Sequence, residues 1–264
     1  MRRRVISAAN RLLGLVDLQL SRNRTQSTVW TPLEAALHGL MSARGSLNVV
    51  QVGANDGKWN DPIHAFLMQE AESTNLLLIE PQPEIAAILA STYENHPSVT
   101  IFEGAVSSES GEMILYRVRP DLWESTEMPY LKDAPAYRAP SGFASTDREH
   151  VQRHVEMLRW RSNGRPVAVD EAIEALRVPT RTLGDLATSH PNVFPVDVLQ
   201  VDVEGIDDRL VLAALESGIF PLIINFEALH LPLDRRAVVE TRLEESGYRL
   251  AAVGGDLLAV RTRH

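Results

Sequence analysis

The chain has 264 residues, of which 44% are hydrophobic, so it is long enough to bury the core of one α/β domain. Its 35 acidic and 26 basic side chains give a net charge of −9, which argues against nucleic acid as a main partner because such binding needs a basic face. Without cysteine it forms no disulfide, thiolate metal site or cysteine nucleophile, and we expect a cytoplasmic location. No apolar run approaches the roughly 18 residues of a membrane span.

Residues 1–30 differ from the rest and are expected to form an amphipathic helix followed by a polar linker. A run of arginines at the start precedes apolar side chains at helical spacing. Asn10 and Arg11 interrupt the apolar run too early for the core of a signal peptide. Two interpretations stay open: residues 1–20 make a peripheral contact with an anionic membrane, or they pack on the domain or on a second subunit of a homo-oligomer.

A glycine-bracketed turn follows the first predicted strand, residues 47–52, and is the centre of the predicted site. Gly53 and Gly57 bracket this turn, and a helix is predicted over residues 61–70. Open α/β sheets bind ligands at such turns, where glycine lets the backbone approach closely. A dinucleotide fingerprint needs a glycine where this chain has Asn55. The turn therefore favours a nucleoside with a small charged tail, such as S-adenosylmethionine (SAM).

Acidic residues close the next two predicted strands. Glu80 directly follows the predicted strand at 76–79, and an acid at this place is the usual partner of the two ribose hydroxyls. Without this acid, the preceding turn would be equally well explained as an ordinary tight turn. Residues 99–102 end in Glu103, which is interpreted either as a contact to the base or as a solvated strand end. Residues 113–118 are predicted to form a strand that pairs with 99–102.

Residues 119–178 interrupt the alternation of strands and helices with a loop rich in proline and aromatic residues. A loop of this length inside a compact domain is usually functional, so we interpret it as a lid that selects the substrate. A helix is predicted from 145 to 160 and a short one at 170–176. His150 and His154 share a face of the first helix, and we expect that face to be solvated rather than metal-binding, because no acidic consensus accompanies them.

Alternation then resumes through predicted strands at 196–203 and 221–226 and a final hairpin at 248–261, which suits an antiparallel pair at a sheet edge. Polar side chains lie at or just beyond the carboxyl ends of the first two strands: Asp202, Glu204, Glu227 and His230. Ligands bind at this edge of an open α/β sheet.

Together these motifs resemble the FkbM family of SAM-dependent methyltransferases. The matching blocks are V-G-A-N-D-G, I-E-P-Q-P-E, E-G-A-V-S-S-E-S-G, T-L-x-D-L and L-Q-V-D-V-E-G, in order over about residues 47–217. The phrase G-F-A-S-T-D-R is similar to members that act in glycan and polyketide tailoring. The resemblance implies an α/β fold with the Rossmann-like, doubly wound sheet of class I methyltransferases. Its strand order would be 3-2-1-4-5-7-6, with the last strand antiparallel, in a methyltransferase domain spanning residues 31–264.

The resemblance also implies a set of cofactor-binding residues: Gln51, Gly53, Asn55, Asp56, Gly57, Glu80, Pro81, Glu103, Gly104, Ala105 and Asp202. The turn would surround the methionine part of SAM, Glu80 would hold the ribose, and Ala105 would lie near the adenine. The family usually has aspartate where this chain has Gln51. Because glutamine carries no charge, contacts to the ammonium group of SAM are expected to be shifted or weaker.

Methyl transfer to an aliphatic hydroxyl needs help with the proton, from a base or a metal ion. His230 is the first candidate for the base, with Asp202 or Glu227 orienting it. The alternative for Glu227 and His230 is a helix-start acid and a packed histidine. A divalent ion such as Mg²⁺ would take its ligands from Asp202, Glu204 and Glu227.

The leading hypothesis is a SAM-dependent O-methyltransferase acting on a hydroxyl of a sugar, a glycan or a polyketide-type metabolite. One alternative on the same fold is an N- or carboxyl-methyltransferase, for which a base matters less. A nicotinamide-dependent oxidoreductase is the alternative from another class, and both Asn55 and the D-V-E-G block argue against it. The expected partner is a small-molecule or glycan acceptor.

Overall fold

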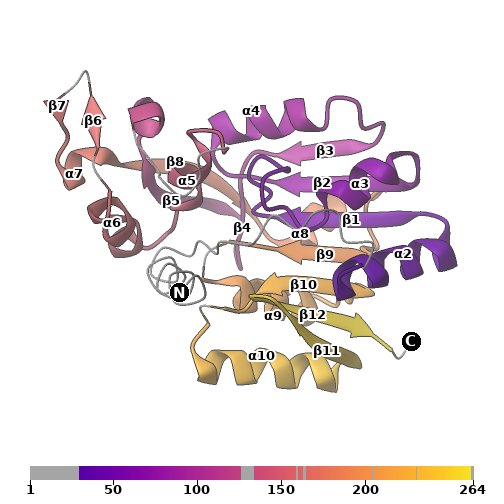
Figure 1. Ribbon diagram of the computed structural model, residues 1–264. Helices are drawn as coiled ribbons and strands as arrows, with labels where there is room; N and C mark the ends of the chain where they lie inside the picture. The colour runs from indigo at the N-terminus through magenta and orange to yellow at the C-terminus, as the bar shows by residue number, and fades with distance from the viewer. Residues whose placement is uncertain are drawn as a thin grey trace, which may run out of the picture.

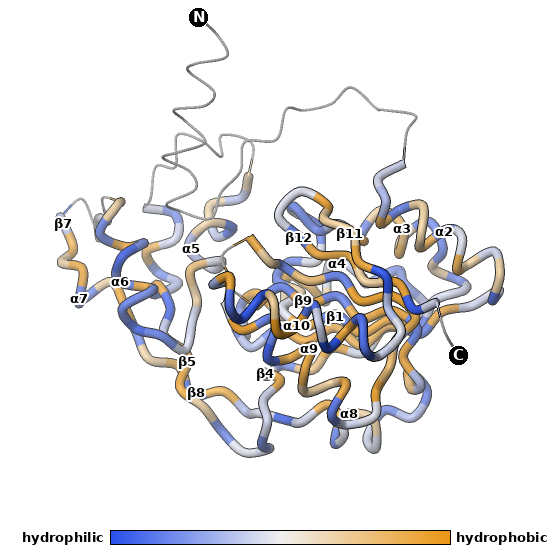
Figure 2. The backbone as a smooth tube through the Cα atoms, turned by 90° about the horizontal axis from the view of Figure 1, so that it is seen from below, coloured by the Kyte–Doolittle hydropathy of each residue, from blue (hydrophilic) through white to orange (hydrophobic). Residues whose placement is uncertain are grey.

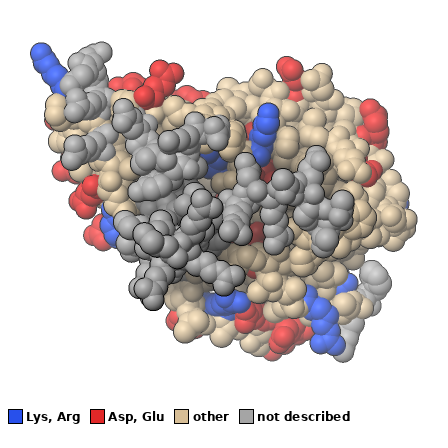
Figure 3. All heavy atoms as spheres, viewed as in Figure 1, with Lys and Arg blue, Asp and Glu red and all other residues tan. Residues whose placement is uncertain are grey.

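The computed structural model describes residues 30–125, 134–158, 160–162, 165–203, 205–229 and 231–262. The helix and linker predicted for residues 1–30 therefore lie outside the described residues, except for Trp30, and so do Glu204 and His230. Within the described ranges, no helix is long and apolar enough to cross a membrane. Acidic and basic side chains are interspersed around the face seen in Figure 3.

A seven-stranded sheet forms the centre of the molecule (Figure 1). Its strands are β1 (Leu47–Val52), β2 (Thr74–Ile79), β3 (Val99–Phe102), β9 (Val198–Val201), β10 (Ile223–Glu227), β11 (Tyr248–Val253) and β12 (Asp256–Arg261). They lie in the order β3-β2-β1-β9-β10-β12-β11, and β12 runs antiparallel to both of its neighbours. Counted along this sheet alone, the order is 3-2-1-4-5-7-6, so the predicted class I methyltransferase sheet and its closing hairpin are confirmed.

Helices cover both faces of this sheet, as a doubly wound fold requires. One face packs against α2 (Pro32–Arg44), α3 (His64–Gln69) and α4 (Pro83–Thr92). The other packs against α8 (Leu183–Ser189), α9 (Asp207–Glu216) and α10 (Leu233–Glu245). The inner strands are largely hydrophobic, as Figure 2 shows for β1 and β9, because they are buried on both sides.

Local signals in the sequence mark the start of α2, the first described helix. The side chain of Thr31 accepts from the amide of Glu34, and the side chain of Glu34 accepts from the amide of Thr31, which completes a capping box. Pro32 occupies the first helical position, where its missing N–H costs nothing. Leu37 and Met41 are buried under the sheet, so local signals and packing agree here.

A second sheet, of three strands, was not predicted. Its order is β4 (Ala105–Val106), β8 (Ile173–Arg181), β5 (Gly111–Val118), with β5 antiparallel to β8 along its whole length. The predicted pairing of residues 113–118 with 99–102 is therefore wrong. The helix predicted at 170–176 is also wrong beyond α7 (Val169–Ala172), since pairing with β5 overrides the helical propensity of Glu174 to Leu176.

The remaining elements of the insertion build a core of their own. They are η2 (Pro120–Ser125), α5 (Arg138–Gly142), α6 (Arg148–Glu156) and the pair β6 (Arg161–Ser162) and β7 (Arg165–Pro166). Trp123, Phe143 and Trp160 pack in this core, and Ile85 of α4 joins it. The insertion lies beyond the carboxyl ends of the parallel strands, at the left of Figure 1. It thus forms a second wall facing the sheet edge.

Helix α6 differs from its prediction in two respects. Asp147 caps it as expected, but it ends at Glu156 instead of reaching Trp160. His154 is buried, and its ring stacks on Phe143 with centroids 4.9 Å apart. The expected solvated face is therefore wrong for His154, because this side of the helix packs into the core of the insertion.

Candidate active site

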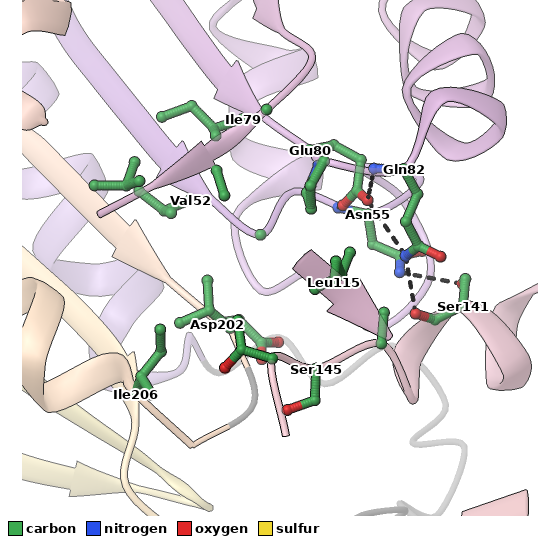
Figure 4. Close-up of a pocket in the computed structure, with 18 of the residues that line it drawn as sticks. Val52, Asn55, Ile79, Glu80, Gln82, Leu115, Ser141, Ser145, Asp202 and Ile206 are labelled. Carbon is green, nitrogen blue, oxygen red and sulfur yellow. Dashed lines mark hydrogen bonds between the residues drawn. The ribbon is translucent and has the colours of Figure 1, made fainter. Parts of the chain in front are cut away.

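A cavity lies between the carboxyl ends of β1, β2 and β9 and the wall formed by the insertion (Figure 4). Its empty volume, which includes the open mouth, is about 870 Å³. Val52 and Ile79 lie on the sheet side, and Leu115 and Ser145 lie on the insertion side. The two parts of the fold thus meet around one cavity.

Gly53 begins the turn after β1, and no other residue fits its position. Its φ is +76°, and an added Cβ would lie 1.8 Å from the carbonyl oxygen of Asp202. The amides of Gly53 and Ala54 both donate to the carbonyl of Ile79 at 3.0 Å. The turn therefore passes directly over the ends of both neighbouring strands, which brings its backbone to the cavity.

Glu80 lies at the end of β2 and is held in place before any ligand binds. One carboxylate oxygen accepts from the amide of Asn55 at 3.0 Å, and the other accepts from the amide of Gln82 at 3.0 Å. The side chain is buried, and this burial raises its pKa to about 7, although its hydrogen bonds and Arg138 oppose the shift. A carboxylate has about four acceptor positions, so it can also accept from ligand hydroxyls.

Helix α5 joins this arrangement from the insertion. The side-chain amide of Asn55 donates to the hydroxyl of Ser141 at 3.2 Å, and that of Gln82 donates to the Ser141 carbonyl at 3.0 Å. The four side chains of Glu80, Asn55, Gln82 and Ser141 gather on one side of the cavity in Figure 4. The Oε1 atom of Gln82 is buried and has no hydrogen-bond partner in the described structure. The side-chain nitrogen of Gln82 is held by Glu80 and Ser141.

Two further bonds dock α5 on the turn between β1 and α3. The hydroxyl of Tyr137 donates to Asp56 at 3.1 Å, and Nε of Arg138 donates to the carbonyl of Trp59 at 3.2 Å. Asp56 also accepts from the amide of Trp59 at 3.0 Å, so this carboxylate shapes the turn and holds the insertion. The insertion is thereby fixed against the predicted cofactor loop.

Asp202 lies beyond the end of β9, and its carboxylate is exposed to the cavity on the side facing Glu80 (Figure 4). The surrounding protein and the nearby carboxylate of Asp207 raise the pKa of Asp202 above its ordinary value. Asp207 itself is buried and accepts from the amides of Val203 and Gly205 at 3.1 Å. Burial raises the pKa of Asp207 to about 6. Asp207 therefore shapes the loop, while Asp202 faces the ligand space.

The structure brings part of the predicted cofactor set to the cavity wall: Gly53, Asn55, Glu80, Pro81, Gly104, Ala105 and Asp202. Their roles toward a cofactor stay predictions. Sequence reasoning missed Gln82, Arg138 and Ser141, which also line the cavity. Gln82 could have been found, because it lies two residues after Glu80 in the same motif. The other two belong to the insertion, whose sequence has no periodic pattern that would place them.

The other predicted residues lie away from the cavity wall. Gln51 is buried and donates to Asp61 at 2.9 Å. Gly57 packs against the ring of Tyr93, whose Cε2 atom would lie 2.5 Å from a Cβ added at Gly57. Asp56 is engaged in the turn, as described above. Glu103 is exposed, which agrees with a solvated strand end. These four residues therefore do not line the cavity.

The proposed catalytic and metal residues are only partly described. Asp202 faces the cavity, but Glu227 is half-buried at the end of β10 and is not part of the cavity wall. Glu204 and His230 lie outside the described residues. Across the described part of the chain, no three histidine, aspartate or glutamate side chains are grouped to hold a metal ion. The predicted set of Asp202, Glu204 and Glu227 thus stays a prediction.

Comparison with known families gives one extensive match. The model of the methyltransferase FkbM domain matches residues 51–250, which include the turn, Glu80, the insertion and the strand that ends before Asp202. The comparison with curated proteins finds no match.

Solved structures resemble the chain only distantly. The Methanococcus jannaschii fibrillarin pre-rRNA processing protein is 12% identical over 92% of this chain and 84% of that chain, with a TM-score of 0.41. The METTL16 MTase domain is 9% identical over 97% and 81% of the two chains, with a TM-score of 0.42. Aeropyrum pernix fibrillarin with natively bound S-adenosyl-L-methionine is 8% identical over 94% and 86%, with a TM-score of 0.38.

Proposed function

Since the chain belongs to the FkbM family of methyltransferases, we propose that it transfers a methyl group from SAM to a hydroxyl oxygen of a sugar, a glycan or a polyketide-type acceptor. SAM-dependent methyl transfer follows from membership of the family. The acceptor atom and the class of acceptor are the proposal. The alternative of a nicotinamide-dependent oxidoreductase is set aside, because the family match covers the cofactor turn itself.

The cavity suits SAM in its shape and its polar groups. Glu80 keeps an acceptor position for a ribose hydroxyl beside its three hydrogen bonds to Asn55 and Gln82. Gly53 lets the turn pass close against the backbone of Asp202, where any side chain would clash. When bound, SAM supplies a methyl group already activated by its positively charged sulfonium. The protein then has to orient the acceptor and manage its proton.

The observation that carries the proposal is the carboxylate of Asp202, which faces the cavity with a raised pKa. A base whose pKa lies nearer to neutral takes a proton from a hydroxyl more effectively, and such help typically contributes about 10²- to 10⁴-fold in rate. Acceptors that are already carboxylates need no base. His230 was the first candidate from sequence but lies outside the described residues, so Asp202 carries the proposal as general base.

The wall beside Asp202 supports an acceptor of mixed polarity. Met113 and Leu115 present apolar surface, whereas Ser145 and Thr146 present hydroxyls. Hydroxylated rings and polyketide-type chains offer both apolar faces and hydrogen-bonding groups. We therefore assign acceptor selection to β5 and to the segment of the insertion that follows α5.

The proposal is tested by incubating the protein with methyl-labelled SAM and a panel of sugars, hydroxylated polyketides, amines and carboxylic acids. Label should enter an alcohol and survive mild alkali, because methyl ethers are stable to base. Label found only in alkali-labile esters or in methylamines would contradict the proposal. Repeating the assay after treatment with EDTA, with and without added Mg²⁺, tests the metal set of Asp202, Glu204 and Glu227.

A further inference from the structure

Three charged side chains of the described residues line the cavity: Glu80, Arg138 and Asp202. The two carboxylates come from strand ends of the main sheet, whereas the guanidinium comes from α5 of the insertion. Arg138 is half-buried, and its contact with the described residues is a hydrogen bond from Nε to the carbonyl of Trp59. In the described structure no carboxylate lies within ion-pair distance of this guanidinium.

A half-buried arginine without an anionic partner is unusual, because burying a charge is costly unless it is paired. The positive charge of Arg138 nevertheless acts on both cavity carboxylates, since it opposes the upward pKa shifts of Glu80 and Asp202. The guanidinium therefore lies within electrostatic reach of both carboxylates and forms an ion pair with neither. Its terminal nitrogens can bind an anionic ligand group in the bidentate manner typical of arginine.

The contacts of α5 show at which end of the cavity the guanidinium of Arg138 lies. Ser141 bonds to Asn55 and Gln82, beside Glu80, where the ribose is expected. Arg138 precedes Ser141 by one helical turn and is tied to Trp59, farther along the turn that follows β1. The guanidinium is thus placed at the turn, on the side where the methionine part of the cofactor is expected.

The charges of the cavity and of SAM complement each other. SAM carries one carboxylate together with an ammonium and a sulfonium group. The cavity presents one guanidinium together with two carboxylates. A site with only acids would repel the carboxylate of the ligand, and among the described residues of the cavity wall Arg138 supplies the positive charge that matches it.

We propose that Arg138 binds the carboxylate of the methionine tail of SAM, so that the insertion completes the cofactor site as well as selecting the acceptor. This inference rests on the SAM-binding part of the proposed function and not on the nature of the acceptor. It also explains why four hydrogen bonds dock α5 on the cofactor turn and on Gln82: they fix the position of the guanidinium.

The test is calorimetric binding of SAM and of decarboxylated SAM, without acceptor, to the wild type, Arg138→Gln and Arg138→Lys. The wild type should prefer SAM by roughly 10- to 100-fold, as expected for a charge-assisted hydrogen bond. Arg138→Gln should lose this preference, and Arg138→Lys should keep part of it. Arg148→Gln, whose arginine pairs with exposed Asp170 in the same insertion, should match the wild type.

An unchanged preference for SAM in Arg138→Gln would overturn the inference and would point to the acceptor as the source of the anion. An equal loss of affinity for both ligands would also overturn it, because the residue would then act through the fold of the turn. Thermal unfolding of each variant shows whether the turn is intact. Because no acceptor is present, a failure of the O-methylation proposal would leave this result unaffected.

Discussion

The backbone amide of Asn55 donates a hydrogen bond of 3.0 Å to the carboxylate of Glu80. This bond joins the turn after β1 to the end of β2, two segments that are 25 residues apart in the sequence. The acid that is predicted to bind the ribose is thereby oriented in advance, which reduces the entropy lost when a ligand binds. Gly53 and Asp202 lie at the neighbouring strand ends, close to this hydrogen bond.

The first prediction is that Glu80 makes folding stability depend on pH. Its folded pKa is about 7 against an ordinary value of 4.5, so the folded protein keeps a proton that the unfolded chain releases. The stability contributed by this group is complete below the unfolded pKa and is lost as the pH rises through the folded one. Relative to Glu80→Gln, the wild type should lose on the order of 1–3 kcal/mol of unfolding free energy between about pH 5 and pH 8.

Urea unfolding of both proteins at the two pH values measures this difference. A gap between wild type and Glu80→Gln that stays constant with pH would show that Glu80 is ionised in the folded protein at both values.

The second prediction separates the steric demand at Gly53 from its backbone conformation. Gly53→Ala places a Cβ against the Asp202 carbonyl and should cost at least about 3 kcal/mol of unfolding free energy. Gly254→Ala is the matched control, since its φ of +68° is similar but nothing lies within 4 Å of its Cβ position. It should cost only about 1–2 kcal/mol. Equal costs in urea unfolding would mean that the Asp202 segment yields without penalty.

The third prediction concerns Asp202 as the base. Asp202→Asn should lower the rate of methyl transfer at saturating SAM roughly 10²- to 10⁴-fold. Because the pKa of Asp202 is raised, the wild-type rate should fall as the pH is lowered toward mildly acidic values and the carboxylate takes up a proton. The variant should lack this limb of the profile. A wild-type pH profile and rate in Asp202→Asn would remove Asp202 from the mechanism.

The fourth prediction concerns the attachment of the insertion. Arg117 of β5 is 5% exposed and bonds to Glu84 of α4 at 3.1 Å and to Glu174 of β8 at 2.8 Å. Both glutamates are more than a third exposed, so solvent screens them, and Arg117→Met should cost about 1–3 kcal/mol rather than the full cost of a buried pair.

Amide exchange should accelerate in β5 and β8 of Arg117→Met while β1 stays protected. Arg119→Met is the control, since its pair with Asp121 is exposed and should contribute little. Similar exchange in the two variants would mean that Arg117 does not hold the insertion in place.

Local signals in the sequence identified the main sheet and much of the site. Residues Leu76 to Ile79 of β2 are a continuous apolar run that stops at Glu80, as buried parallel strands do. The strand β1 is recognisable from its apolar residues and the glycine turn after it, although Asn48 and Gln51 interrupt the run. Thr31 and Pro32 mark a helix start by capping chemistry that needs no tertiary context. Such features depend on neighbours in the sequence, so they could be predicted.

Features that depend on distant contacts could not be predicted. Residues 173–181 contain good helix formers, but β5 lies beside them and they form a strand. Arg138 and Ser141 come to the cavity through bonds to residues about 60 to 90 positions away in the sequence. His154 is buried because Phe143 packs on it, and this contact has no signature in the helical pattern.

Calorimetric binding of SAM to the wild type and to Glu80→Ala, with NAD as the control ligand, tests whether this cavity is the cofactor site. Glu112→Ala is the control variant, because this glutamate is exposed and lies away from the cavity wall. We predict that the wild type and Glu112→Ala bind SAM and not NAD, and that Glu80→Ala loses about tenfold or more in affinity. Unchanged SAM binding in Glu80→Ala, or tighter binding of NAD than of SAM, would contradict the assignment of this cavity as the cofactor site.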